Sequence, residues 1–157
     1  MTIRVREGTP GDDPYIDALG ELSAQTSVSP LRNVSQDQAA LSFRSLRLSC
    51  RGRRGALVLV AERDGSRAGF LILLTDVPDE VTRQDQAFIA YMAVGPEYRR
   101  QGLGQALLDA AQAQAAQRRL PHISLMVTGA NLHARSLYSK FGFAEERILM
   151  TKSTGAR

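Results

Sequence analysis

The 157-residue sequence has little of the chemistry that disulfides and metal sites need. It contains one cysteine, Cys50, so an internal disulfide and a cysteine-rich metal site are both excluded. His122 and His133 are the only histidines, and we therefore expect no zinc site and no other metal. No apolar run approaches the roughly 18 residues of a membrane span, and the N-terminus lacks the apolar stretch of a signal peptide. These absences predict a soluble, cytoplasmic protein with no membrane partner.

Lysine is scarce as well, since Lys140 and Lys152 are the only two, and the net charge of +4 therefore comes almost entirely from arginine. The densest cluster of arginines lies between Arg44 and Arg54 and has only Phe43 as an interleaved aromatic residue. That is a weak nucleic-acid footprint, and we predict no nucleic-acid partner. A nucleic-acid binder that uses this cluster is kept as a third functional hypothesis, which a steep salt dependence of duplex affinity would reveal.

The length fits one domain, residues 1–157, and a composition of 43% hydrophobic and 23% charged residues is that of a globular protein. Apolar periodicity, capping signals and turn residues predict alternating strands and helices along the whole chain. The predicted strands are 3–6, 56–62, 68–75, 87–94, 122–127 and 145–151, and the predicted helices start at about residues 14, 36, 104 and 132. This order predicts a mixed α/β sheet with helices on its faces.

The stretch VGPEYRRQGLGQALL, residues 94–108, places Arg99 and Arg100 directly before Gly102-Leu103-Gly104 at the expected start of a helix. The first N–H groups of a helix have no partner within it and, together with the helix dipole, attract anions. Glycines let a ligand approach the backbone, and the arginines add fixed charge suited to a diphosphate. The pattern therefore predicts a phosphate-binding loop.

The residues alone leave the phosphate ligand of this loop open. A P-loop of the form G-x-x-x-x-G-K-[ST] is absent from the chain. A dinucleotide fingerprint requires another glycine, but Gly104 is followed by Gln105-Ala106-Leu107, and His122–Leu125 holds no acidic partner for a ribose. Both of these common nucleotide sites are thus excluded.

Arg99-Arg100-Gln101-Gly102-Leu103-Gly104 resembles the R/Q-x-x-G-x-G/A signature of the GNAT superfamily of acyl-CoA-dependent N-acetyltransferases. ISLMVTGANLHARSLYSKFGFAEE, residues 123–146, is similar to the second motif of that family, while the N-terminal third is similar only in its order of elements. The resemblance implies a GNAT-like fold: a central, mostly antiparallel sheet with a splayed pair of parallel strands, and helices on both faces. It also implies acetyl-CoA as acyl donor and an amine as acceptor.

The resemblance carries roles over to particular residues. The residues that it assigns to coenzyme A are Met92, Ala93, Val94, Arg99, Arg100, Gln101, Gly102, Leu103, Gly104, Gln105 and Asn131. Asn131 also suits a helix N-cap, and the two roles stay open. Tyr138 would donate a proton to the leaving thiolate, and the alternative is a buried core tyrosine with a satisfied hydroxyl.

The general base is not evident in the sequence. Some family members have a glutamate near the start of the strand before the signature, where this chain reads Asp85-Gln86-Ala87-Phe88. Gln86 cannot take up a proton, so Asp85 is the candidate base, with Glu80, Glu62 or a water chain as alternatives. Each of these acids would also serve as a solvated surface charge.

The leading hypothesis is an acetyl-CoA-dependent N-acetyltransferase that acts on a primary amine of a small molecule, an antibiotic, an amino acid or a protein N-terminus. The second hypothesis is a non-catalytic acyl-CoA-binding or regulatory module on the same fold. Retention of Tyr138 favours the enzyme, and the lack of an evident base favours the module. A homodimer is left open by the sequence.

Overall fold

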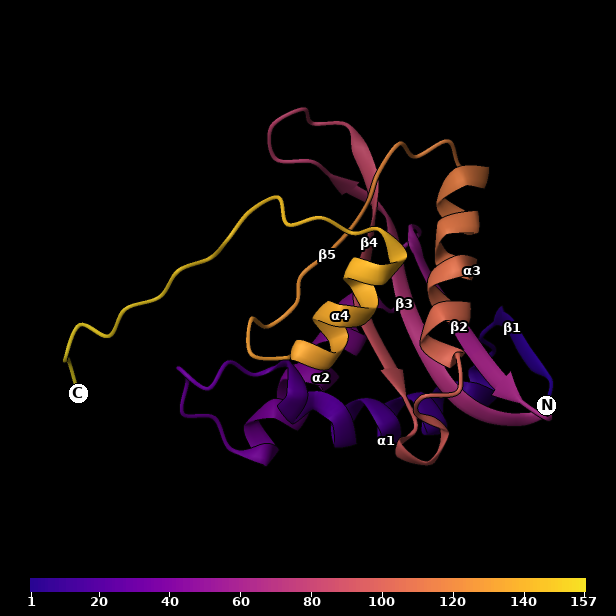
Figure 1. The fold of residues 1–157 in the computed structure, drawn as a ribbon, viewed down its shortest axis with the longest axis horizontal. Helices are drawn as coiled ribbons and strands as arrows, with labels where there is room; N and C mark the ends of the chain where they lie inside the picture. Colours follow the sequence, from indigo (N-terminus) through magenta and orange to yellow (C-terminus); the bar gives the residue numbers. More distant parts are fainter.

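A five-stranded sheet of order β1-β2-β3-β4-β5 forms the centre of the computed structural model, which describes residues 1–157 (Figure 1). The strands are β1 Ile3–Glu7, β2 Ala56–Arg63, β3 Ser66–Pro78, β4 Asp85–Val94 and β5 Ile123–Leu125. The α-helices are α1 Asp13–Ser23, α2 Gln36–Cys50, α3 Leu103–Gln117 and α4 Leu132–Phe141, with short 3-10 turns η1 Pro10–Asp12, η2 Ala24–Ser27 and η3 Pro96–Tyr98. None of these helices combines the length and the apolarity needed to cross a membrane.

The sheet is antiparallel from β1 to β4, and only the last pair, β4 with β5, runs parallel. A parallel pair needs a crossover connection, which α3 supplies here. The parallel pairing joins Ala87–Ile89 to Ile123–Leu125 and then stops, although β4 continues to Val94. The predicted mixed sheet with a splayed parallel pair is therefore confirmed.

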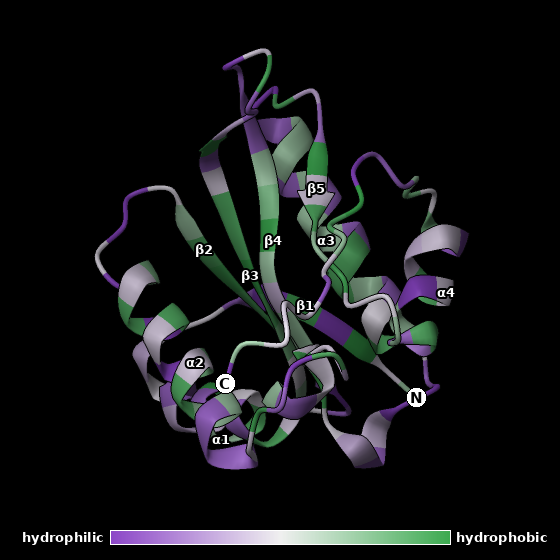
Figure 2. Cartoon of the chain, turned by 90° about the vertical axis from the view of Figure 1, so that its left-hand side faces the viewer, coloured by the Kyte–Doolittle hydropathy of each residue, from purple (hydrophilic) through white to green (hydrophobic).

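Two apolar clusters cover the two faces of the sheet, because alternate residues of a strand point to opposite sides. Phe70 and Ile72 of β3 belong to the cluster under α1 and α2, whereas Leu71 belongs to the cluster that packs against Leu107 and Leu108 of α3. Helices α1 and α2 pack on the first cluster, and helices α3 and α4 pack on the second. In Figure 2 the central strands are mostly green, since most of their side chains are apolar.

Local sequence signals produced the elements that they predicted. Ser35 accepts from the N–H of Gln38 and the Gln38 side chain accepts from the N–H of Ser35, which is the predicted capping box of α2. Asp64 and Gly65 have φ values of 49° and 84°, as a tight hairpin turn between β2 and β3 requires. Helix α4 covers the predicted range, and Gly142 ends it in the left-handed conformation.

The predicted last strand, residues 145–151, is wrong. The segment after α4 forms no strand and leaves Ile148, Leu149 and Met150 exposed. This segment contacts the rest of the protein through side chains, for example through an ion pair of Arg147 with Glu80. A run with β-propensity becomes a strand only where a partner edge supplies the ladder of hydrogen bonds, and no ladder forms here.

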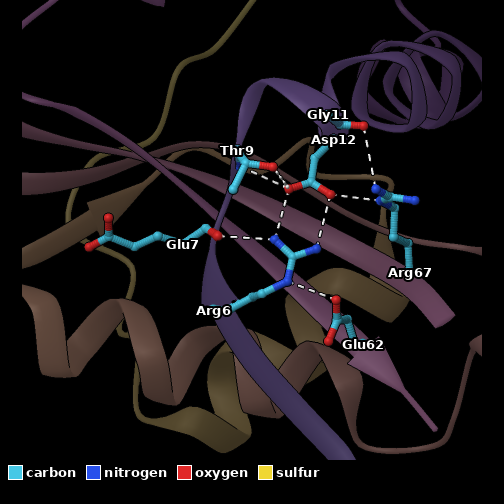
Figure 3. A network of polar contacts seen from close by, with 7 residues as sticks. All are labelled: Arg6, Glu7, Thr9, Gly11, Asp12, Glu62 and Arg67. Atoms are coloured by element: carbon cyan, nitrogen blue, oxygen red, sulfur yellow. Dashed lines mark hydrogen bonds and ion pairs between the residues drawn. The ribbon is translucent and has the colours of Figure 1, made fainter. Parts of the chain in front are cut away.

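The predicted N-cap of the first helix is also wrong by one residue. The cap is Asp12 rather than Asp13, and the Asp12 side chain makes no capping bond to the helix. Its carboxylate is instead fully buried among the guanidinium groups of Arg6 and Arg67 and the N–H of Thr9 (Figure 3). The Asp-Asp-Pro run is equally consistent with either cap, and only the long-range ion pairs decide between them.

Candidate functional site

The loop between β4 and α3 contains a run of backbone N–H groups that have no hydrogen-bond partner. The N–H groups of residues 100–105 donate no hydrogen bond within the chain, and the first intrahelical bond is that of Ala106 to the carbonyl of Gly102. Arg100 and Gly102 both adopt left-handed conformations, with φ of 58° and 86°. Successive N–H groups in such conformations, followed by a helix N-terminus, form a concave site for an anion.

The charged and small residues of this loop suit the same chemistry. Neither Arg99 nor Arg100 pairs with a carboxylate of the chain, so their charge is available to a ligand. A Cβ atom built on Gly102 would lie 3.7 Å from Ile3 Cδ1, so it is the positive φ of this residue, more than lack of space, that requires glycine. Leu103 is buried and anchors the loop to the core.

Gly104 has a second role, which the sequence did not indicate. A Cβ atom at this position would lie 3.0 Å from Leu137 Cδ2, so the glycine lets α4 pack closely against the first turn of α3. Gln105 points away from this contact and lies on the exposed side, with a 3.4 Å contact to Asp109. The loop and α4 therefore meet at Gly104.

The splayed end of β4 leaves backbone groups without a sheet partner. The N–H of Gly95 bonds to the carbonyl of Ala68, and in an antiparallel ladder the bonded residues alternate. Ala93 therefore pairs with Phe70 of β3, whereas Met92 and Val94 direct their N–H and carbonyl groups to the other side, beyond the end of the β5 pairing. Of the predicted Met92–Val94 stretch, the backbone of Met92 and Val94 is free and that of Ala93 is not.

A β-bulge marks the point where β4 leaves its neighbour. Tyr91 stands opposite Ile72 and Ile89 opposite Leu73, so Ala90 is an extra residue on β4. Bulges bend and twist a strand, and this one lies directly after the last residue that pairs with β5. The bulge and the end of the pairing together open the gap.

Helix α4 places Tyr138 on the apolar cluster that covers this face of the sheet. Tyr138 packs against the same apolar cluster as Met92 and Val94, and its ring meets Phe143 edge-on at a centroid distance of 5.8 Å. The contact belongs to the helix end, where the N–H of Phe143 bonds to the carbonyl of Tyr138 and that of Gly142 to Ser139. Burial raises the pKa of the Tyr138 hydroxyl, which stays protonated at neutral pH.

Asn131 caps α4. Its side-chain oxygen accepts a hydrogen bond of 3.2 Å from the N–H of Ala134. This geometry gives Asn131 a structural role in placing α4 and leaves its side-chain amide N–H groups free. The two roles that the sequence left open are compatible in one residue.

One candidate base lies at the other end of β4 from the splayed end, and the other two are held in ion pairs. Asp85 is exposed, stands opposite Pro78 at the start of β4, and is about 20 Å from Met92 along an extended strand. Glu62 pairs with Arg6 at 2.7 Å, and Glu80 pairs with Arg147 at 2.9 Å. No candidate carboxylate is thus both unpaired and close to the splayed end of β4.

Most of the arginine cluster is neutralised by helix α1. Arg47, which is 6% exposed, bonds to Asp13 and Asp17, both at 2.8 Å, and Arg44 pairs with Glu21. These arginines join α1 to α2 and do not form a free basic face. The observation weighs against the nucleic-acid hypothesis.

No group of three or more histidine, cysteine, aspartate or glutamate side chains is arranged to hold a metal ion.

One site contact was missed by sequence reasoning: Arg63 of β2 donates to the side chain of Gln101 in the loop. The two residues are far apart in the chain, and no local pattern signals their meeting.

Comparison with known proteins gives a consistent result. The model of the acetyltransferase (GNAT) family matches residues 24–143. The [ribosomal protein bS18]-alanine N-acetyltransferase of Escherichia coli (strain K12) is 39% identical over 64 residues, which are 41% of this chain and 43% of that protein. The chain thus matches less than half the length of this curated relative.

Solved structures share the fold over nearly the whole chain. A putative acetyl transferase from Pyrococcus furiosus superimposes with a TM-score of 0.81 at 22% identity, covering 97% of this chain and 99% of that one. The aminoglycoside N-acetyltransferase AAC(6')-Iy in complex with CoA gives a TM-score of 0.70 at 15% identity, covering 98% and 95%. At such identities the likeness shows the fold alone.

Proposed function

The chain belongs to the acetyltransferase (GNAT) family, and from this premise we propose that it transfers an acetyl group from acetyl-CoA to a primary amine. The observation that carries the proposal is the run of unpaired N–H groups at residues 100–105 beside the splayed end of β4. We propose that residues 1–157 act as one acetyltransferase domain and that it works in the cytoplasm.

The loop fits the pyrophosphate of coenzyme A. The free N–H groups of residues 100–105 would donate to phosphate oxygens, and Arg99 and Arg100 would supply the countercharge. Gly102, in the left-handed conformation, would aim these groups at the ligand. Met92 and Val94 would pair with the amides of the pantetheine arm, as a neighbouring strand would.

Acetyl-CoA, when bound, supplies an activated acyl group, and the chain provides the surroundings for its transfer. A free N–H of the splayed part of β4 would polarise the thioester carbonyl. Tyr138, protonated at neutral pH because burial raises its pKa, would give its proton to the departing thiolate. Since Asp85 lies at the other end of β4 and Glu62 and Glu80 are held in ion pairs, we propose that the proton of the amine leaves through water.

For the acceptor we propose a chemical class and no particular molecule. The relative from Escherichia coli acts on an alanine of ribosomal protein bS18, as its name states, and AAC(6')-Iy acts on aminoglycosides. We propose an amine acceptor of one of these two kinds, a polypeptide N-terminus or an amine of a small molecule.

The test is a screen with acetyl-CoA that reads free thiol. The panel contains peptides with N-terminal alanine, aminoglycosides and simple primary amines, and calorimetry with coenzyme A runs beside it. Thiol release with at least one amine supports the enzyme. Binding of coenzyme A without release across the panel would instead support a non-catalytic acyl-CoA-binding module, and absence of binding would refute both.

A further inference from the structure

The loop of residues 99–105 adopts a conformation that its own backbone hydrogen bonds do not stabilise. Arg100 is a non-glycine residue with φ of 58°, a conformation that costs about 1–2 kcal/mol. Apart from the bond that the Gly102 carbonyl accepts from Ala106, no backbone hydrogen bond involves residues 100–102. Some other contact must favour this shape over relaxed alternatives.

The side chain of Gln101 makes that contact. Its Nε2 donates to the carbonyl of Glu97 at 3.2 Å, and its Oε1 accepts from Nη1 of Arg63. The amide therefore links the loop to η3 and to β2, and its oxygen and nitrogen each have a partner. Gln101 can offer a ligand its backbone N–H and the second N–H of its side-chain amide, while its side-chain oxygen is occupied by Arg63.

Arg63 is well placed to hold this amide. It is the last residue of β2 and stands opposite Ile3 of β1 and Ser66 of β3, so its backbone belongs to the sheet. Its Nε atom is buried without a hydrogen-bond partner, and the nearest carboxylate, that of Asp64, lies 3.6 Å away. The bond to Gln101 is thus the only hydrogen bond of the guanidinium group.

We propose that Arg63 is a positioning residue for coenzyme A: through Gln101 it holds residues 100–102 in the conformation that leaves their N–H groups open to the pyrophosphate. The inference rests on the proposed function, because it needs coenzyme A as the ligand of the loop. It differs from a direct role, in which Arg63 itself would contact a phosphate.

Calorimetry with coenzyme A on wild type, Arg63→Met, Arg63→Lys, Gln101→Met and the double variant Arg63→Met/Gln101→Met tests the proposal. Methionine keeps most of the apolar stem and removes the donor. A hydrogen bond from a charged group of this kind predicts a Kd raised roughly 10- to 100-fold in Arg63→Met. Arg63→Lys restores a donor and should recover part of the affinity.

The double variant should bind no more weakly than Arg63→Met, since both changes break one contact. Steady-state kinetics should place the loss in the KM for acetyl-CoA and leave kcat within about twofold. Arg4→Met is the matched control, because Arg4 is an exposed arginine of β1 and its loss removes the same charge without touching the loop.

A parallel titration with 3′-dephospho-CoA separates positioning from direct contact with the 3′-phosphate. Positioning predicts the same fold-loss with both ligands. A loss seen only with coenzyme A would mean that Arg63 contacts the 3′-phosphate and would overturn the proposal.

Wild-type affinity in Arg63→Met, an equal loss in Arg4→Met, or additive losses in the double variant would overturn the proposal as well. If Arg63→Met does not fold, Gln101→Met decides alone, since its side chain lies in the loop. Failure of wild type to bind coenzyme A would refute the proposed function itself, and the inference with it.

Discussion

The hydroxyl group of Tyr138 is the proposed proton donor to the departing thiolate. Tyr138→Phe keeps the ring and its edge-on contact with Phe143, so the fold should survive. If the hydroxyl protonates the thiolate, kcat should fall by roughly 10²–10⁴ while the affinity for coenzyme A stays close to that of wild type. Steady-state kinetics with a thermal melt as folding control measures this. An unchanged kcat, under conditions where chemistry limits the rate, would return Tyr138 to a packing role.

The carboxylate of Asp85, in contrast to the Tyr138 hydroxyl, is expected to contribute little to kcat. It is exposed and lies at the far end of β4 from Met92. We therefore expect Asp85→Asn to lower kcat less than tenfold, because water and not this group takes the proton. A thousandfold loss at unchanged KM for acetyl-CoA would identify Asp85 as the base.

The buried carboxylate of Asp12 should make stability depend on pH. The hydrogen bonds from Arg6 are the largest cause that holds its pKa well below the usual value, with bonds from Thr9 and Arg67 adding to it (Figure 3). Since the folded pKa lies below the unfolded value of about 3.9, the stabilisation is complete above that pH and is lost as pH falls through and below it.

The matching variant is Asp12→Asn. Removal of one partner of a buried ion pair costs about 3 kcal/mol, so the variant should be less stable by that order at pH 7. Urea unfolding at pH 7, 5 and 3 measures this. As the pH falls, the free energy of unfolding of wild type should fall more steeply than that of Asp12→Asn, so the difference in stability between the two proteins should be smaller at pH 3 than at pH 7. Parallel curves for the two proteins would show that Asp12 does not titrate with folding.

Helices and hairpins were predictable because their signals are local. The capping box of α2, the Asp64-Gly65 turn and the glycine that ends α4 each lie within a few residues of the element that they define. The last strand was not predictable in this way, because a strand needs a partner edge that propensity alone cannot provide. The bulge at Ala90 likewise depends on the register between β3 and β4 and leaves no mark on the sequence.

The packing of α3 against α4 can be tested at Gly104. Gly104→Ala gains about 1 kcal/mol of helix propensity but pushes a Cβ atom to 3.0 Å from Leu137 Cδ2. The two effects should nearly cancel in the wild-type background. In a Leu137→Ala background the crowding is gone, and Gly104→Ala should stabilise by about 1 kcal/mol. Denaturant unfolding of the four proteins gives the interaction free energy between positions 104 and 137. Equal effects of Gly104→Ala in both backgrounds would show that Leu137 does not crowd a Cβ atom at position 104.

The arrangement of the whole molecule is what assembles the site. Arg99–Gln105 and Tyr138 come from two motifs that are separate in the sequence, and the resemblance placed each of them but not the contacts between them. The crossover through α3 sets β5 beside β4, and the early end of their pairing opens the space that both motifs border. The contacts Arg63–Gln101 and Gly104–Leu137 join distant segments, and such pairs follow from the fold and not from local pattern.

Because coenzyme A would bind the native loop and not the unfolded chain, it should stabilise the whole fold. At a concentration of 100 Kd the gain is about 2.7 kcal/mol, which raises the Tm of a domain of this size by roughly 5–10 °C. Gly102→Val should remove this shift, since its φ of 86° disfavours a β-branched residue and the backbone N–H groups would turn away from the ligand. Gly52→Val is the matched control, because Gly52 has a similar φ of 73° in open space after α2. Both variants should melt lower than wild type without ligand, and only Gly52→Val should keep the full shift with coenzyme A. An equal shift in both variants would mean that residues 100–105 form a turn and not the ligand site.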